Sequence, residues 1–147
     1  MKRLTAGLAA AVLATSGAVF GLDETAFAAS PTCAVTADTP DIVIQNGPTV
    51  KGVAWIDCTQ TAKFNLTTKL WRNNGHDGSY TSFTKSVTNY TGNHIGVDSF
   101  HTCAPGSGTF QWHTEGIIDW KIYSGSTVIA SGSGFIDNSS DINLQCY

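Results

Sequence analysis

The chain begins with the three-part pattern of an export signal, and this start limits the folds open to everything after it. Two basic residues are followed by an apolar, alanine-rich run over residues 4–22 and by the small-x-small motif Ala26-Phe27-Ala28. The apolar run is too short and too small-sided to span a membrane comfortably. We expect residues 1–28 to be a signal peptide, and residues 29–147 to be secreted and to fold where thiols oxidise.

The mature chain has the size of one domain and carries few charges. After residue 28 it holds six basic and nine acidic residues, with no cluster of lysines or arginines. A mildly acidic surface without a basic patch excludes nucleic acid as a partner. It also lacks the basic amphipathic segment that would bind an anionic membrane. We therefore expect a single secreted domain over residues 29–147, with a flexible N-terminal segment at residues 29–48.

Four cysteines lie in the mature chain, at Cys33, Cys58, Cys103 and Cys146. An even number in a small exported domain predicts two disulfides, and four cysteines allow three connectivities. We favour Cys33–Cys58 and Cys103–Cys146, which join each end of the chain to a neighbouring strand. No CxxC pair is present, so the cysteines do not indicate a metal site.

The residue pattern predicts short strands throughout, with no sustained helical spacing of apolar residues. Expected strands cover residues 32–37, 41–45, 50–58, 63–72, 80–90, 94–103, 109–123, 127–135 and 142–146. Turns are expected at residues 73–78, at Gly92-Asn93, and at residues 104–108, 124–126 and 137–141. Gly116 interrupts the apolar row of its strand and predicts a β-bulge.

This strand pattern predicts an all-β fold, namely an antiparallel β-sandwich of the immunoglobulin-like or jelly-roll-like kind with two disulfides. Cys58, Cys103 and Cys146 share the face of their strands' apolar residues, so both disulfides are expected against the core. Trp112 and Trp120 belong to the apolar row of residues 109–123 and are expected in the core.

Ionisable side chains are densest on the two segments 94–103 and 109–123. The members are His94, Asp98, His101, His113, Glu115 and Asp119. If the two segments paired as a hairpin, His101 and His113 could approach each other as zinc ligands or as an acid–base pair. Strand parity splits the group over two faces, however, and no serine-nucleophile motif is present. We therefore predict no catalytic residue, no metal site, no cofactor and no enzymatic activity.

Two features predict a binding surface instead. Ile42, Val43 and Ile44 form a short run of high β propensity between two prolines, which could add a strand to the sheet of a partner protein. Trp55 and Trp71 lie on the faces opposite their strands' apolar rows, where a ring could stack on a sugar or anchor a partner.

The arrangement of these motifs resembles small exported β proteins of Streptomyces and related actinobacteria. The resemblance is carried by the signal end at residues 26–28, the Cys33…Cys58 pair, the segment 103–110 with sequence CAPGSGTF, and the near-terminal Cys146. One such group is the adaptor subunit of the umbrella toxin particles, which links a lectin-bearing subunit to the stalked toxin subunit. The resemblance implies a structural role, with the N-terminal segment as a docking element.

The sequence thus predicts a secreted, non-enzymatic protein-binding module, an adaptor or structural subunit of an extracellular antibacterial toxin complex. Its partner would be a larger secreted protein subunit. A carbohydrate-binding module that uses Trp55 and Trp71 as a stacking platform is the first alternative. A secreted enzyme inhibitor is the second, because the Cys103-Ala104-Pro105-Gly106 stretch superficially resembles one in the subtilisin inhibitor family.

Overall fold

A computed structural model describes residues 30–75, 79–137 and 141–146, and this part of the chain contains strands and turns but no helix. The signal peptide expected at residues 1–28 lies outside the described residues. The described part contains no helix that is long and apolar enough to cross a membrane. The strands are β1 (Cys33–Ala37), β2 (Asp41–Ile44), β3 (Pro48–Asn73), β4 (Tyr80–Thr102), β5 (Gly108–Ser124), β6 (Thr127–Asp137) and β7 (Ile142–Cys146).

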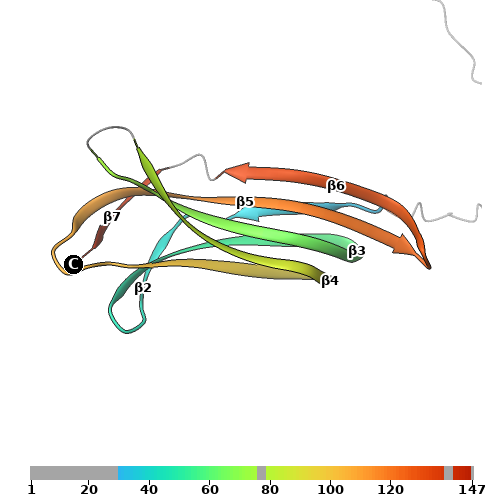
Figure 1. The fold of residues 1–147 in the computed structure, drawn as a ribbon, viewed down its shortest axis with the longest axis horizontal. Helices are drawn as coiled ribbons and strands as arrows, with labels where there is room; N and C mark the ends of the chain where they lie inside the picture. Colours follow the sequence, from blue (N-terminus) through green and yellow to red (C-terminus); the bar gives the residue numbers. More distant parts are fainter. Residues whose placement is uncertain (1–29, 76–78, 138–140, 147) are drawn as a thin grey trace, which may run out of the picture.

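One long antiparallel hairpin, formed by β3 and β4, organises the molecule. The two strands pair from Asn73↔Tyr80 to Thr49↔Thr102, with a register shift between Asp57 and Ala62. At this shift β3 contributes four extra residues (58–61) and β4 contributes one, so the hairpin bends. In Figure 1 the bend lies at the right-hand end, and the two halves of the hairpin run back from it toward the left.

The prediction of a turn at Gly92-Asn93 is wrong. Gly92 pairs with Ala62 and His94 pairs with Asp57, so β4 continues along β3 through this point without reversing. A Cβ atom on Gly92 would lie 2.7 Å from Cε1 of Tyr90, so glycine here makes room for a neighbouring ring and does not reverse the chain. The segments 80–90 and 94–103 are therefore two halves of one strand, as are the segments 50–58 and 63–72.

The remaining strands are added to the edges of this hairpin. β1 and β2 pair with the first half of β3, whereas β5 pairs with its second half, from Ala62↔Ile122 to Arg72↔Trp112. β6 and β7 then pair with β5. All of these pairs are antiparallel, and hydrogen bonds join the strands into one seven-stranded sheet. The expected all-β antiparallel fold is confirmed.

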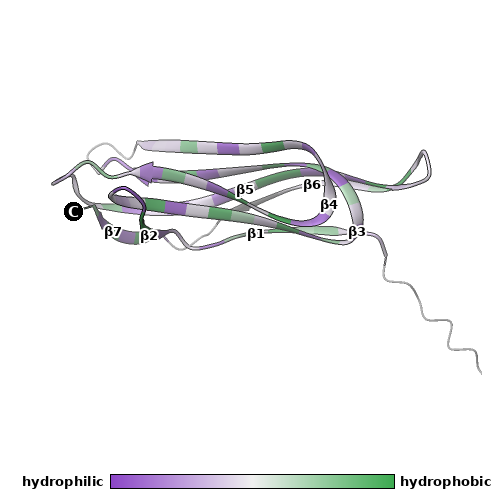
Figure 2. Ribbon diagram, turned by 90° about the horizontal axis from the view of Figure 1, so that it is seen from below, coloured by the Kyte–Doolittle hydropathy of each residue, from purple (hydrophilic) through white to green (hydrophobic). Residues whose placement is uncertain are grey.

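The two halves of the bent hairpin pack face to face, and their inward side chains form the core. Strand residues alternate between hydrophobic and hydrophilic, as Figure 2 shows. The first core cluster, nearer the bend, includes Ile56, Phe64, Leu66, Ile118 and Ile122. The second core cluster comprises Val50, Leu70, Cys103, Trp112 and Cys146. Trp112 is fully buried, as predicted, whereas Trp120 is partly buried against the first core cluster.

Small and hydroxyl-bearing residues separate the two clusters, at a waist where the halves come closest. A Cβ atom on Gly52 would lie 2.6 Å from Thr114 Oγ1, and one on Gly116 would lie 2.9 Å from Ala54 Cβ. Thr68 Oγ1 crosses the waist and donates a 2.7 Å hydrogen bond to the Val97 carbonyl. Side chains larger than these would hold the two halves apart.

The prediction of a bulge at Gly116 is wrong, because this glycine serves the close packing at the waist. Gly116 lies in regular register between Thr68 and Ile136, so the ladder is not interrupted there. Glycine occupies this position because the opposite half leaves no room for a side chain, which is the second common use of glycine in a strand.

Both favoured disulfides are present. Cys33 and Cys58 face each other across the β1–β3 pair and are packed against the first core cluster. Cys103 and Cys146 are buried in the second core cluster and join the end of β4 to β7. The loops they close span 25 and 43 residues, so the chain-entropy model gives each bond about 3–4 kcal/mol of stabilisation. Two disulfides are consistent with an oxidising, extracellular environment.

We predict that Gly116→Ala lowers the free energy of unfolding by about 1–3 kcal/mol, because the added methyl group would overpack the waist against Ala54 and Val35. Urea unfolding followed by tryptophan fluorescence measures this change. Gly134→Ala is the matched control, since its methyl group would meet Ile118 and Val35 only at 3.5 and 3.6 Å. The control should change stability by less than about 0.5 kcal/mol. Equal losses in the two variants would contradict close packing at the waist.

Candidate functional site

The predicted docking run, Ile42 to Ile44, forms the edge strand β2. Its residues pair with β3 through Ile42↔Val50 and Val43↔Thr49, and no described strand pairs with its other edge. Ile42 packs against the second core cluster, whereas Ile44 is 80% exposed. The run therefore combines one anchoring isoleucine with one isoleucine that is free to contact another molecule.

Trp55 lies on the outward face of the first half of the hairpin and is held in place from two sides. Its Nε1 donates a 2.7 Å hydrogen bond to Asp38 Oδ2, and its ring stacks on His94 with 5.3 Å between centroids. A Cβ atom on Gly96 would lie 2.5 Å from the indole, so the ring lies directly over this glycine on β4. The sheet thus covers part of the ring, and Trp55 is half-buried.

Trp71 lies on the outward face of the second half and belongs to an aromatic cluster with Tyr80 and His113. Its ring centroid is 6.1 Å from that of His113 and 6.4 Å from that of Tyr80. Tyr80 is 44% exposed, and its ring centroid lies 5.8 Å from that of His113. The three rings therefore contact one another across three strands. His113 Nδ1 also lies 3.1 Å from Asp141 Oδ1.

A nearly buried carboxylate supports this aromatic cluster. Glu115 is only 7% exposed; its Oε2 accepts a 2.7 Å hydrogen bond from Trp71 Nε1, and its Oε1 lies 3.2 Å from Lys69 Nζ. Lys69 Nζ in turn lies 5.6 Å from the Trp71 ring centroid. A buried charge persists only when it is paired and hydrogen-bonded, and both conditions are met here. The indole is therefore fixed in orientation before any ligand arrives.

The two tryptophans do not share one platform. Trp55 is on the outward face of the first half of β3, and Trp71 is on the outward face of the second half. Because the halves pack through their inward faces, the two rings lie on opposite sides of the molecule. Any ligand that stacks on both at once would have to wrap around it.

The ionisable residues of segments 94–103 and 109–123 do not gather into one site. The hairpin considered for these segments does not form, because β4 pairs with β3 and β5 pairs with the other half of β3. Three of them instead pair with residues of the adjacent strand β3. His94 Nδ1 lies 2.6 Å from Asp57 Oδ1, Asp98 Oδ2 lies 3.7 Å from Lys51 Nζ, and Asp119 accepts hydrogen bonds from Asn65. Within the described residues, no group of three or more His, Cys, Asp or Glu side chains could hold a metal ion.

Among the titratable groups of residues 30–75, 79–137 and 141–146, His101 is the one whose environment clearly shifts its pKa. Its ring stacks on Phe83 with 4.1 Å between centroids and lies 5.5 Å from Trp112, and its Nε2 is 3.5 Å from Arg72 Nη1. Burial lowers the pKa of His101 below its ordinary value of 6.5, and the positive charge of Arg72 lowers it further.

Sequence reasoning missed the role of Arg72 beside His101. Its guanidinium carbon lies 4.9 Å from the Phe110 ring centroid and 5.9 Å from that of Phe83, within cation–π range of both. The signal was present in the parity of β3, because residue 72 continues the inward row of residues 64, 66, 68 and 70. A long side chain in this position can bury its stem and keep its charged end near the surface.

Comparison with known proteins finds no matching family model, no similar curated protein and no similar solved structure.

We predict that folding stability falls as the pH drops below 6.5, since the unfolded chain then binds a proton at His101 before the folded chain does. Above pH 6.5 this contribution is fully present, and it is lost as the pH falls toward the lower folded pKa. The difference between wild type and His101→Gln in urea unfolding at pH 7.5 and pH 5 measures it. In NMR titrations, Arg72→Gln should raise the pKa of His101. An unchanged His101 pKa in this variant would rule out the contribution of Arg72.

Proposed function

We propose that this chain is a secreted, non-enzymatic β-sandwich module that binds another protein through the open edge of β2. The observation that carries the proposal is the exposure of Ile44 at 80% on a strand that pairs with β3 on one side and with no described strand on the other. Burying this exposed isoleucine against a partner would stabilise the contact by about 1.5–3 kcal/mol relative to leaving the side chain in water.

Strand addition is the binding mode that such an edge favours. The unpaired backbone N–H and C=O groups of an edge strand supply affinity, while alternate side chains supply specificity. β2 is short and lies between Pro40 and Pro48, which limits uncontrolled pairing with further copies of the chain. Ile42 anchors the strand against the second core cluster, so the edge is held in an extended form before the partner binds.

We further propose that the partner is a larger secreted subunit and that the chain acts as an adaptor in an extracellular antibacterial toxin complex. The two disulfides are consistent with service outside the cell, where thiols are oxidised. The resemblance of the cysteine motifs to exported actinobacterial proteins supports the same role. In this arrangement β2 would be the docking element, and the rest of the sheet would be a rigid spacer.

The first test is capture of the partner by the mature protein from the culture supernatant of its source. We predict that Ile44→Lys reduces the captured partner at least about tenfold, because the charge removes an apolar contact from the edge and opposes strand pairing. Quantitative mass spectrometry of the eluates measures the change. The melting temperature should stay close to that of the wild type, since Ile44 makes little contact with the core.

Ile129→Lys provides the matched control, because Ile129 is 48% exposed on the edge strand β6. This variant should capture the partner as well as the wild type does. Equal capture by the Ile44→Lys variant and the wild type would contradict docking at β2. A loss seen only in Ile129→Lys would place the partner on the opposite edge of the sheet and would also contradict the proposal.

A second function, carbohydrate binding, is favoured by the aromatic cluster of Trp71, Tyr80 and His113. The indole of Trp71 is fixed by Glu115, and the exposed ring of Tyr80 lies beside it. Pre-ordered aromatic rings bind the apolar faces of sugars at low cost in conformational entropy. This site lies on the second half of the hairpin, away from β2.

If the aromatic cluster binds a sugar, Trp71→Ala should weaken that binding at least about tenfold, as expected when a central stacked tryptophan is truncated. Glycan arrays identify the sugar, and isothermal titration calorimetry measures the loss. Trp55→Ala, on the opposite side of the molecule, should retain the wild-type affinity. Blank arrays for the wild type, or equal losses in both variants, would remove this candidate.

A further inference from the structure

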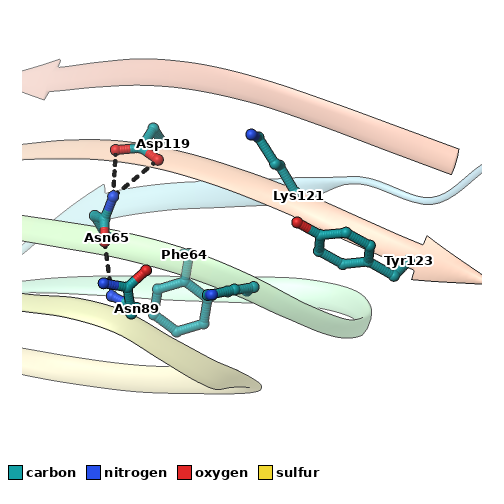
Figure 3. A pocket seen from close by; sticks show the side chains of 7 residues that line it. Phe64, Asn65, Asn89, Asp119, Lys121 and Tyr123 are labelled. Atoms are coloured by element: carbon teal, nitrogen blue, oxygen red, sulfur yellow. Dashed lines mark hydrogen bonds between the residues drawn. The ribbon is translucent and has the colours of Figure 1, made fainter. Parts of the chain in front are cut away.

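A polar pocket of about 160 Å³ lies beside the bend, on the outward face of β3 and β5. We call it the corner pocket; its lining residues are Lys63, Phe64, Asn65, Asn89, Asp119, Lys121 and Tyr123. Figure 3 shows that the labelled side chains come from β3, β4 and β5 and surround a common space. Asn65 is six residues from Trp71 along β3, roughly 20 Å at the rise of a strand, so the pocket is separate from the aromatic cluster.

Two lysines stand directly opposite each other at the corner pocket. Lys63 and Lys121 are register partners on adjacent strands, and both are exposed. Like charges in this position repel and destabilise a sheet. Neither lysine forms an ion pair with another described residue. Two unpaired cations side by side form a ready position for a carboxylate, which could accept hydrogen bonds from both.

Asparagines and a carboxylate form the neighbouring wall, and their positions are fixed. Asn65 Nδ2 donates to both oxygens of Asp119, at 3.0 and 2.9 Å, and Asn65 Oδ1 accepts a 2.7 Å hydrogen bond from the Asn89 backbone N–H. These contacts leave Asp119 with further acceptor positions, because a carboxylate has about four. Those positions suit hydroxyl groups of a ligand.

A backbone irregularity in β4 builds this wall. The register shifts between Phe64 and Leu66, where two residues of β4 oppose the single residue Asn65. One of the two, Asn89, has a left-handed backbone conformation with a φ of 52°, which is uncommon in non-glycine residues. Non-glycine residues in this conformation persist when their surroundings hold them, and they concentrate at functional sites.

Asn46, in the turn between β2 and β3, also has a positive φ, of 58°. Among the described residues, these are the two non-glycine positions with a positive φ. A tight turn explains the conformation of Asn46, because asparagine tolerates it there. Asn89 lies within a long strand instead, and its conformation directs its backbone N–H to Asn65 at the corner pocket.

Tyr123 completes the corner pocket with an aromatic ring. It is 41% exposed, and the register between β5 and β6 shifts next to it, between Ile122 and Tyr123. In Figure 3 its ring lies beside Lys121, on the other side of the pocket from Asp119 and Asn65. An exposed ring here can contact the C–H face of a sugar while the lysines and Asp119 contact its polar groups.

We propose that the corner pocket binds a sugar that carries a carboxylate, a hexuronic acid unit. The carboxylate would lie between Lys63 and Lys121, the hydroxyl groups would donate to Asp119, and the ring would pack on Tyr123. A neutral sugar would leave the lysines unpaired, and a simple carboxylate would leave Asp119 and Tyr123 without contacts. The volume of about 160 Å³ is below the range typical of drug-sized ligands, so one sugar unit is the expected occupant.

Calorimetric titration of the mature protein at low salt with D-glucuronate, D-glucose and acetate tests the ligand class. Glucuronate should bind saturably, and the other two should bind at least about tenfold more weakly, since each lacks contacts that involve charged groups. Affinity should fall as salt is raised, because the lysines are exposed and screened. A polyglucuronate in a parallel titration shows whether the unit is recognised free or within a polymer; both results support the pocket.

Lys63→Gln and Lys121→Gln should each weaken glucuronate binding about tenfold or more. Lys85→Gln is the matched control, because Lys85 is an exposed lysine on β4 that does not line the pocket. It makes the same charge change and should retain the wild-type affinity. Without ligand, Lys121→Gln should also raise the melting temperature at low salt, since it removes the repulsion from Lys63.

Three results would overturn the proposal. They are no saturable binding of glucuronate, equal binding of acetate and glucuronate, and equal affinities in the Lys85→Gln and Lys121→Gln variants. The outcome is distinguishable from that of partner docking, because Ile44→Lys leaves the corner pocket intact and should bind glucuronate like the wild type.

Discussion

The structure depends on the close approach of the two halves of one bent hairpin. Gly52 and Gly116 leave no room for a Cβ atom between the halves, and the hydrogen bond from Thr68 to the Val97 carbonyl crosses the same waist. This contact lets the two core clusters form on either side of it, each closed by one disulfide. Because β3 and β4 take part in both halves, a change at the waist is transmitted to both clusters through continuous strands.

The same bend decides where the binding features lie. It turns the outward faces of the two halves in opposite directions, so Trp55 and Trp71 lie on opposite sides and cannot share a ligand. Two further register shifts, beside Asn89 and beside Tyr123, border the corner pocket. The open edge of β2 lies on the first half alone. The proposed binding surfaces are therefore separate: the edge of β2 for a protein strand, and the aromatic cluster and the corner pocket for sugars.

Local patterns predicted the strands well, but they failed where a residue has two structural uses. The alternation around Phe64, Leu66 and Leu70 correctly predicted an inward row, and cysteine parity correctly placed both disulfides against the core. Gly92-Asn93 was expected to reverse the chain, yet it lies at the bend of a continuous strand. Gly116 was expected in a bulge, yet it lies in a regular ladder under a close contact. In each case the residue permits both arrangements, and only the opposing strand selects one.

The sequence by itself determined which side chains can face a core, that the chain is all-β, and that its cysteines form two disulfides, because these depend on period-two alternation and on residue type. Only the tertiary structure decided which strands are neighbours. Alternation is the same whichever strand lies alongside, so it could not show that β4 pairs with both halves of β3 or that β5 pairs with the second half. The aromatic cluster, the environment of His101 and the corner pocket all arise from those pairings, which bring together residues far apart in the chain.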